Sequence, residues 1–284
     1  MSRVVLVHGI AQQYKGSQTL LADWYPALAD GLALATGVQL PYEDVSMAFY
    51  GDVFRPAGHR GLGVPELDAS DVMDGLERDL LLQWWAEAAE ADPAVPGPEA
   101  PARLRTPYLV QRALDALSHS AFFAGLSERL LIWSARQVRT YFTDAEVRAV
   151  IQQRLERCVT ADTELIVAHS LGSVVAYETL CAHPDWRDMS LVTLGSPLAV
   201  RNLVFERLLP PPVDGRGSWP SPVKRWLNVA DRGDVVPLVK QLAPRFGERI
   251  RDVSIHNGAK AHDVRPYLTA RETGLGIAEG LGLT

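Results

Sequence analysis

Short, continuous apolar runs rich in β-branched residues alternate along the chain with longer segments of helical periodicity. The first run, residues 4–7, ends at His8 and Gly9 and precedes a helical pattern over 17–36. A run that is apolar on both faces is typical of a strand in a parallel sheet. Similar runs predict further strands at 45–50, 164–168, 191–194, 223–230 and 251–256. The alternation predicts an open, mostly parallel α/β sheet of about six strands with helices on both faces.

The alternation stops between residues 54 and 140. Two helical patterns in this stretch are separated by a linker that contains Pro93, Pro96, Pro98 and Pro101. We therefore expect 1–53 and 141–284 to form an α/β core, and 54–140 to form a largely helical insertion. The glycine-rich stretch 274–282 predicts a loose terminus.

Composition and charge narrow the class of protein. The chain of 284 residues is 47% hydrophobic and 22% charged, which is typical of a globular protein and argues against disorder. With 28 basic and 34 acidic residues, the net charge of -6 argues against sequence-independent binding to nucleic acid. The two cysteines, Cys158 and Cys181, form neither a disulfide framework nor a zinc motif. Because there is no signal peptide pattern and no apolar run of about 18 residues, we expect a cytoplasmic protein without a transmembrane segment. The sequence has no H-E-x-x-H motif and no cluster of Cys and His, so we expect no metal site.

Candidate chemistry is concentrated around Ser170. The apolar strand 164–168 runs into the sequence His-Ser-Leu-Gly at 169–172, and a predicted helix follows over 173–182. A serine on such a strand-to-helix turn exposes its Oγ, and the helix start offers unpaired N–H groups to a developing oxyanion. Serine is also a favoured helix N-cap, so Ser170 alone does not establish a nucleophile.

The strand, turn and helix resemble the nucleophile elbow of the α/β-hydrolase superfamily, whose motif is G-x-S-x-G. Ala168 stands where the motif has its first glycine, and alanine is still small enough for the tight turn. The resemblance implies an α/β-hydrolase fold in which the insertion forms a helical cap. In this family the serine is followed along the chain by an acid and then by a histidine.

Both partners that the resemblance implies follow later strands, where the active sites of such sheets lie. Asp234 begins the sequence Asp-Val-Val-Pro, which resembles the turn that carries the acid in many lipases and esterases. His262 lies in the loop after the last predicted strand and is the expected base. Asp231 is the alternative acid, although aspartate at this place also commonly caps a turn.

The other histidines have structural interpretations. His256 lies inside the predicted strand 251–256 and is expected to face a neighbouring layer, whereas His169 is expected to form a structural hydrogen bond beside the serine. His262 itself has the alternative of being an ordinary surface histidine.

The first strand ends in the sequence His-Gly-Ile at 8–10, which resembles the turn where these hydrolases place an oxyanion donor. Glycine lets the backbone approach a substrate closely. The resemblance therefore implies that the backbone N–H groups of Ile10 and Leu171 form an oxyanion hole. His8 is expected to brace the loop.

These residues imply a serine hydrolase that cleaves an acyl ester through an acyl-enzyme, without a cofactor. The early pattern V-H-G-I-x-Q-Q is similar to bacterial relatives of GPI-inositol-deacylase-like lipases. Thioester, amide or lactone cleavage by the same residues stays open, as does a non-catalytic interaction module. The presence of all three residue types in the required order favours the enzyme.

Aromatic pairs in the insertion bear on the substrate. Trp84 and Trp85, with Phe122 and Phe123, suggest an apolar wall for an acyl chain, but amphipathic helices normally bury such residues against one another. No basic cluster marks a site for an anionic group. We therefore expect a small, uncharged, apolar acyl substrate with a short to medium chain, and we make no prediction of oligomeric state.

Overall fold

The computed structural model describes residues 2–55, 66–98, 106–120, 127–258 and 261–283. Within these residues six strands form one sheet in the order β2-β1-β3-β4-β5-β6, and all neighbouring strands are parallel. The strands are β1 (Val4–Val7), β2 (Val45–Ala48), β3 (Leu165–His169), β4 (Met189–Leu194), β5 (Val223–Asp231) and β6 (Ile250–Ile255). The predicted α/β sheet of about six strands is confirmed.

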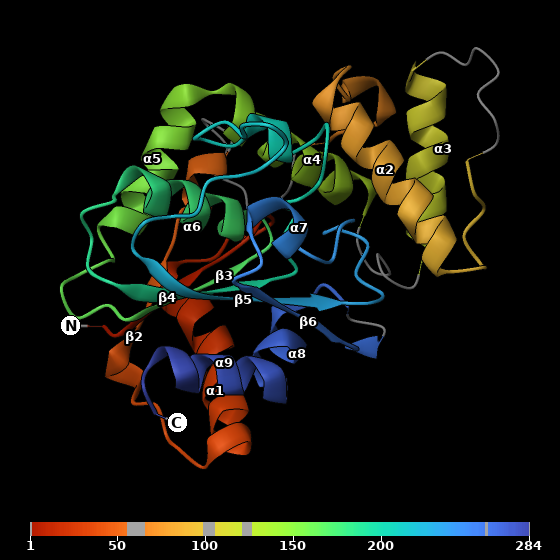
Figure 1. The fold of residues 1–284 in the computed structure, drawn as a ribbon. Coiled ribbons are helices and arrows are strands. Elements are labelled where there is room, and N and C mark those ends of the chain that lie inside the picture. Colours follow the sequence, from red (N-terminus) through yellow and green to blue (C-terminus); the bar gives the residue numbers. More distant parts are fainter. Residues whose placement is uncertain (1, 56–65, 99–105, 121–126, 259–260, 284) are drawn as a thin grey trace.

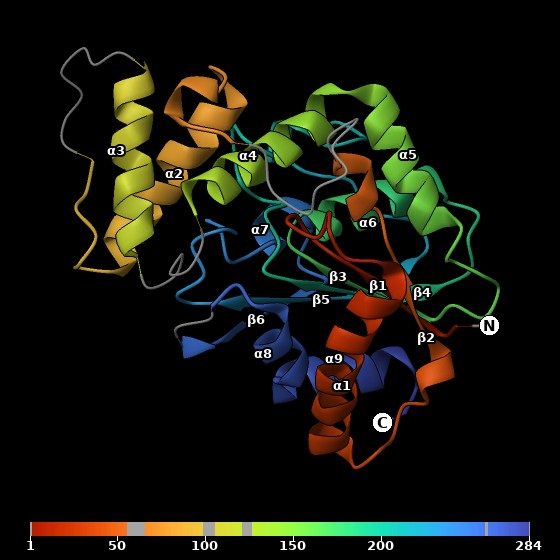
Figure 2. The ribbon, with the colours of Figure 1, turned by 180° about the vertical axis from the view of Figure 1, so that it is seen from behind.

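Helices cover both faces of this sheet, as Figures 1 and 2 show. One face carries α1 (Ser17–Thr36), α8 (Val264–Thr269) and α9 (Arg271–Gly280). The opposite face carries α5 (Ala145–Glu156), α6 (Leu171–Ala182) and the short α7 (Ala243–Phe246). The prediction of helices on both faces is thus confirmed.

The two-residue alternation of the strands divides the apolar core between these layers. Val4 and Leu6 of β1 belong to the hydrophobic cluster that includes the buried side chains of α1, α8 and α9. Val5 and Val7 point to the other face and join the cluster that includes α6. The continuous apolar runs in the sequence therefore correspond to strands buried on both faces.

The insertion contributes helices α2 (Leu76–Ala91), α3 (Thr106–His119) and α4 (Glu128–Thr143). They stand on the α6 side of the sheet, out toward the end to which β5 and β6 run (Figure 1). Their buried side chains, among them Leu81 and Trp84, belong to the same hydrophobic cluster as Ile166 and Ala168 of β3. The described part of the insertion therefore shares one apolar core with the sheet.

The glycine-rich stretch 274–282 is largely helical, so the prediction of a loose terminus is wrong. Gly274 and Gly276 lie on α9, where they allow close packing rather than flexibility. A Cβ at Gly274 would lie 2.1 Å from the carbonyl oxygen of Gly31, and one at Gly276 would lie 2.2 Å from a methyl carbon of Leu227. The missing side chains let α9 pack directly against α1 and the sheet.

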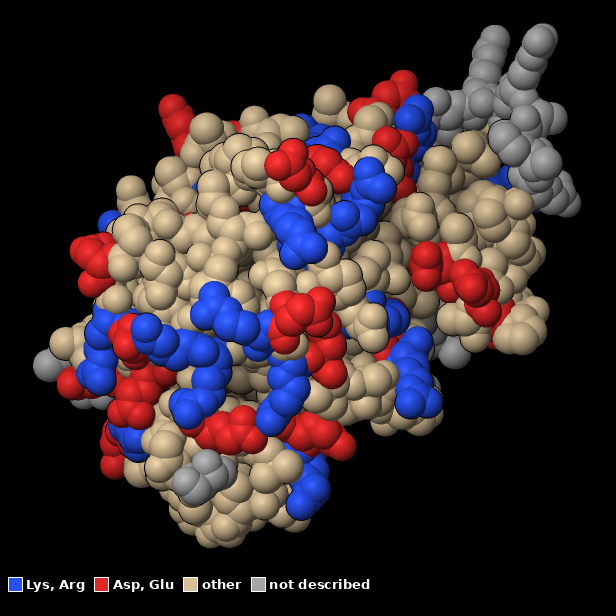
Figure 3. Space-filling view, in the orientation of Figure 1, with Lys and Arg blue, Asp and Glu red and all other residues tan. Residues whose placement is uncertain are grey.

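Among the described residues, no helix combines the length and the apolar character that a bilayer crossing requires. On the face seen in Figure 3, basic and acidic side chains lie next to one another rather than in separate patches. That face therefore carries no extended surface of a single charge.

Candidate active site

Ser170 occupies the sharp turn between β3 and α6, with φ 54° and ψ -130°. This left-handed φ is unfavourable for a residue with a side chain, and it persists only where the surroundings fix it. The Ser170 N–H donates to the carbonyl oxygen of Leu194 at 3.0 Å, and the Ser173 hydroxyl donates to the carbonyl oxygen of Ser170 at 2.6 Å. The turn thus holds the serine in a conformation that local preference disfavours.

Two glycines let the serine turn and the loop after β1 approach each other. Strand pairing places Val7 opposite Ala168, so both turns leave the sheet side by side. A Cβ at Gly172 would lie 2.4 Å from the carbonyl oxygen of His8, and one at Gly9 would lie 2.7 Å from the Ser170 Cβ. Both glycines are therefore required, because the turn at Ser170 and the loop after β1 lie in direct contact.

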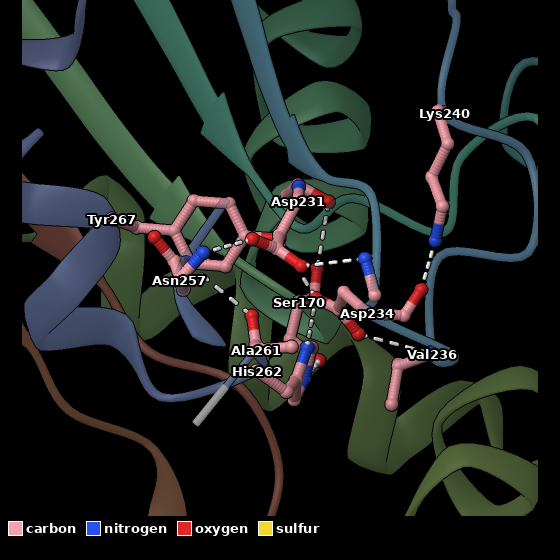
Figure 4. A network of polar contacts seen from close by, with 11 residues as sticks. Ser170, Asp231, Asp234, Val236, Lys240, Asn257, Ala261, His262 and Tyr267 are labelled. Atoms are coloured by element: carbon pink, nitrogen blue, oxygen red, sulfur yellow. Dashed lines mark hydrogen bonds and ion pairs between the residues drawn. The ribbon is translucent and has the colours of Figure 1, made fainter. Parts of the chain in front are cut away.

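The structure brings Ser170, His262 and Asp234 into one hydrogen-bonded chain (Figure 4). The His262 Nε2 lies 3.0 Å from the Ser170 Oγ, and the His262 Nδ1 lies 2.7 Å from the Asp234 Oδ2. Ser170 is 2% exposed and Asp234 is 1% exposed. Because the carboxylate accepts at Nδ1, that nitrogen carries the hydrogen and Nε2 is left to accept the serine hydroxyl proton.

Asp231, the alternative acid, has a different set of partners. Its Oδ1 accepts from the Gly233 N–H at 2.6 Å, and its Oδ2 accepts from the Asn257 N–H. The buried carboxylate thus joins the turn after β5 to the loop after β6 (Figure 4). Asp234, at the end of that turn, is the carboxylate that bonds to His262.

Tyr267 of α8 is a site residue that the sequence did not reveal. Its buried hydroxyl donates to the Asp234 Oδ2 at 2.8 Å and accepts from the Asp231 N–H at 2.9 Å. Burial raises the pKa of Tyr267, so the hydroxyl stays protonated and its single hydrogen is available to the carboxylate. Tyr267 reaches Asp234 because helix α8 folds back over the end of β5. No local sequence pattern predicts this tertiary contact.

His8 is buried beneath the loop after β1 and braces it. Its Nδ1 donates to the Gly9 carbonyl oxygen at 2.7 Å, while its Nε2 accepts from the Tyr50 N–H at 3.0 Å. Burial lowers the pKa of His8 to about 4, so the ring is neutral near pH 7 and has one donor and one acceptor nitrogen. The geometry agrees with the bracing role expected from the sequence.

The two remaining histidines near the site differ in environment. His169 is buried, has a hydrogen bond with the His262 backbone, and its ring centroid lies 4.6 Å from that of His262. Burial, together with the neighbouring His262, lowers the pKa of His169 well below its usual range, so it is neutral. His256 is exposed and lies just after β6, so its predicted place inside the strand is wrong.

Ser170 opens into a narrow cavity of about 20 Å³, which is room for roughly one water-sized sphere. Ile10 and Leu171, the predicted oxyanion donors, line it beside the serine. Leu171 is the first residue of α6, so its N–H has no partner within the helix. The other described lining residues are all apolar: Leu80, Trp84, Val138, Pro197, Val200, Val204, Val236 and Leu238.

The insertion supplies part of this apolar wall. Trp84 of α2 and Val138 of α4 line the cavity, whereas the neighbouring Trp85 is buried in the core and its indole N–H donates to the Pro96 carbonyl oxygen at 2.6 Å. Phe122 and Phe123 lie outside the described residues. The two tryptophans thus have different surroundings, one facing the cavity and one inside the helical packing.

Comparison of this chain with protein-family models gives no match, and comparison with curated proteins gives none either. Within the part of the chain that the structure describes, no group of three or more His, Cys, Asp or Glu side chains is arranged to hold a metal ion. A fold of this kind supports many activities, so the chemistry of the site rests on its own geometry.

Proposed function

We propose that the protein is a serine hydrolase with an α/β-hydrolase fold that cleaves acyl esters through an acyl-enzyme. The hydrogen-bonded chain from the Ser170 Oγ through His262 to the buried Asp234 is the observation that carries this proposal. Nucleophile, base and acid are each within hydrogen-bond distance of the next, which is the geometry that activates a weak hydroxyl nucleophile. A cytoplasmic location and independence of metals and cofactors belong to the same proposal.

In acylation, the Ser170 Oγ attacks the ester carbonyl carbon while the His262 Nε2 accepts the hydroxyl proton. Asp234 holds the imidazole in the required tautomer and stabilises the imidazolium. The negative charge that develops on the carbonyl oxygen is stabilised by the N–H groups of Ile10 and Leu171. When the tetrahedral intermediate collapses, the C–O bond to the alcohol breaks and His262 returns the proton to the leaving oxygen.

In deacylation, a water molecule replaces the alcohol. His262 accepts a proton from this water as its oxygen attacks the acyl carbon, and the same N–H groups stabilise the second oxyanion. The bond to the Ser170 Oγ then breaks, and the serine recovers its proton from His262. The products are a carboxylic acid, which ionises in solution, and the regenerated enzyme.

The lining of the cavity supports an uncharged, apolar acyl group. Apart from Ser170, all the described lining residues have apolar side chains, so an ionised acyl group would lose its hydration without gaining a partner. The small volume favours a short chain, because longer chains need the walls to move.

A fluorophosphonate probe tests the proposal directly. We expect the wild type to gain one phosphonyl group per chain by intact-mass spectrometry, and Ser170→Ala to gain none, since the probe reacts only with an activated nucleophile. Ser134→Ala, which changes a buried serine of α4, serves as the matched control and is expected to label as the wild type does. Labelling of Ser170→Ala at the wild-type rate would show that the nucleophile is elsewhere.

Trp84 is expected to limit the length of the acyl chain. With nitrophenyl esters of increasing chain length, the wild type should show its highest kcat/KM on short chains. Trp84→Ala should shift the preference to longer ones, since each methylene in an apolar pocket contributes about 1–3 kcal/mol. The measurement is kcat/KM across the ester series for both proteins.

Trp85→Ala is the matched control for Trp84→Ala. Both changes remove a buried tryptophan and are expected to lower the free energy of unfolding by about 3–5 kcal/mol. Only Trp84 faces the cavity, so Trp85→Ala should keep the wild-type ranking of esters. If the wild type and both variants ranked the esters identically, Trp84 would not limit the length of the acyl chain.

A further inference from the structure

The loop after β1 is fixed on both sides of Ile10. On one side, His8 donates to the Gly9 carbonyl oxygen and so fixes the peptide group that bears the Ile10 N–H. On the other side, Ala11 has φ 63°, in the left-handed region that residues with side chains rarely adopt. A residue keeps this conformation only where its surroundings hold it.

The partner of Ala11 comes from the insertion. The Gln137 Oε1, on α4, accepts from the Ala11 N–H at 3.1 Å, and the Gln137 Nε2 donates to the Gln13 Oε1 at 3.0 Å. Gln137 is 2% exposed and Gln13 is 1% exposed. Because an N–H can bond only to the oxygen end of the amide, the contact with Ala11 fixes the orientation of the whole Gln137 side chain.

Helix α4 is itself anchored to α2 and to α6 shortly after Gln137. The Arg139 Nε donates to the buried Glu77 of α2 at 2.7 Å, and the Tyr141 hydroxyl donates to the buried Glu178 of α6 at 2.7 Å. Removing one partner of a buried charged hydrogen bond is strongly destabilising, so these contacts hold α4 in place. The helix can therefore act as a fixed support for the loop.

We propose that Gln137 is a positioning residue through which the insertion sets the direction of the Ile10 N–H. The peptide groups on either side of Ile10 share its Cα, so a displacement of the Ala11 peptide also displaces this Cα and strains the peptide group that bears the donor. Without Gln137 we expect Ala11 to relax toward negative φ and to carry the Ile10 N–H out of line with the developing oxyanion. This inference rests on the proposed function and makes α4 part of the catalytic framework.

Hydrogen exchange of the full-length protein tests the contact without any need for activity. Gln137→Met keeps the side-chain length but removes the amide, Gln137→Glu keeps an acceptor, and Gln83→Met changes an exposed glutamine of α2 as the control. We expect faster exchange across residues 9–14 in Gln137→Met, a smaller change in Gln137→Glu and none in Gln83→Met. Wild-type exchange in Gln137→Met would overturn the inference.

Steady-state kinetics on a short-chain nitrophenyl ester tests the consequence for catalysis. Gln137→Met is expected to lower kcat by about 10- to 100-fold, because a misplaced donor weakens stabilisation of the transition state. KM should stay within about twofold, since the ground-state substrate does not need this donor. Gln137→Glu should recover most of the lost kcat. Unchanged kcat in Gln137→Met, or equal losses in both variants, would contradict the positioning role.

The two measurements separate this inference from the proposed function. Suppose that the wild type neither reacts with the probe nor hydrolyses esters, while Gln137→Met still exchanges faster than the wild type across residues 9–14. That result would contradict the hydrolase proposal alone. An active wild type with unchanged exchange and kcat in Gln137→Met would contradict this inference alone. If Gln137→Met does not fold, Gln13→Met decides: it removes only the second hydrogen bond and should change exchange and kcat in the same direction to a smaller extent.

Discussion

Replacing His262 by alanine is expected to lower kcat by about 10,000- to 1,000,000-fold, the range for loss of the base in a serine hydrolase. The His262 Nε2 lies 3.0 Å from the Ser170 Oγ, so its loss leaves the hydroxyl without a proton acceptor. KM should change little, because the ring accepts a proton rather than binding the acyl chain. Steady-state rates on a short-chain nitrophenyl ester give both constants.

His256→Ala is the control for this change. His256 lies just after the same strand, β6, but is exposed, so its removal is expected to leave kcat close to that of the wild type. Comparable thermal unfolding of the two variants would show that the loss at His262 is chemical. If His262→Ala kept more than about a tenth of the wild-type kcat, the ring would not be the general base.

The sheet could be predicted from the sequence because each strand is a short apolar run buried on both faces. Val4–Val7 is the clearest case, with every residue buried. Element ends were less predictable: the sequence pattern favours Thr143 as the cap of a helix over 144–157, but the cap is Asp144, whose Oδ1 accepts from the N–H groups of Glu146 and Val147 at 3.0 Å. Thr143 instead belongs to α4, since two helices meet there with almost no linker.

The principal site residues could be predicted because each follows a strand whose carboxyl end lies at the same edge of the sheet. The sequence left the choice between two acids open, because Asp231 ends β5 and Asp234 lies in the turn that follows directly. Which of the two carboxylates bonds to His262 depends on the path of the turn after β5 and on where the loop after β6 meets this turn. Both are tertiary features.

Tyr267 and Gln137 could not be predicted, for a related reason. Each lies on a helix whose sequence gives only an apolar face, and neither belongs to a motif. Tyr267 reaches Asp234 over 33 positions, and Gln137 reaches Ala11 over 126. Contacts of this kind depend on how α8 and α4 pack against the sheet.

Asp234→Asn is expected to lower kcat by about 10,000-fold while the fold stays intact, as for the corresponding change in a serine protease. A neutral amide cannot stabilise the imidazolium, and its NH₂ group would disturb the tautomer that His262 needs to accept the Ser170 proton. The size of the side chain is unchanged, and its one remaining oxygen can still accept from the Tyr267 hydroxyl or the Val236 N–H, so we expect the variant to fold. Rates on the short-chain ester and thermal unfolding would be measured together.

Asp231→Asn is expected to have the opposite profile, with lower stability and largely retained kcat. Both carboxylate oxygens of Asp231 accept partly buried backbone N–H groups, from Gly233 and Asn257. An asparagine offers only one oxygen, so one of these groups would lose its partner at a cost of about 1–3 kcal/mol in the free energy of unfolding. The measurements are thermal unfolding and kcat at a temperature where both variants are folded. If Asp231→Asn proved the more damaging to kcat with its fold intact, Asp231 rather than Asp234 would be the catalytic acid.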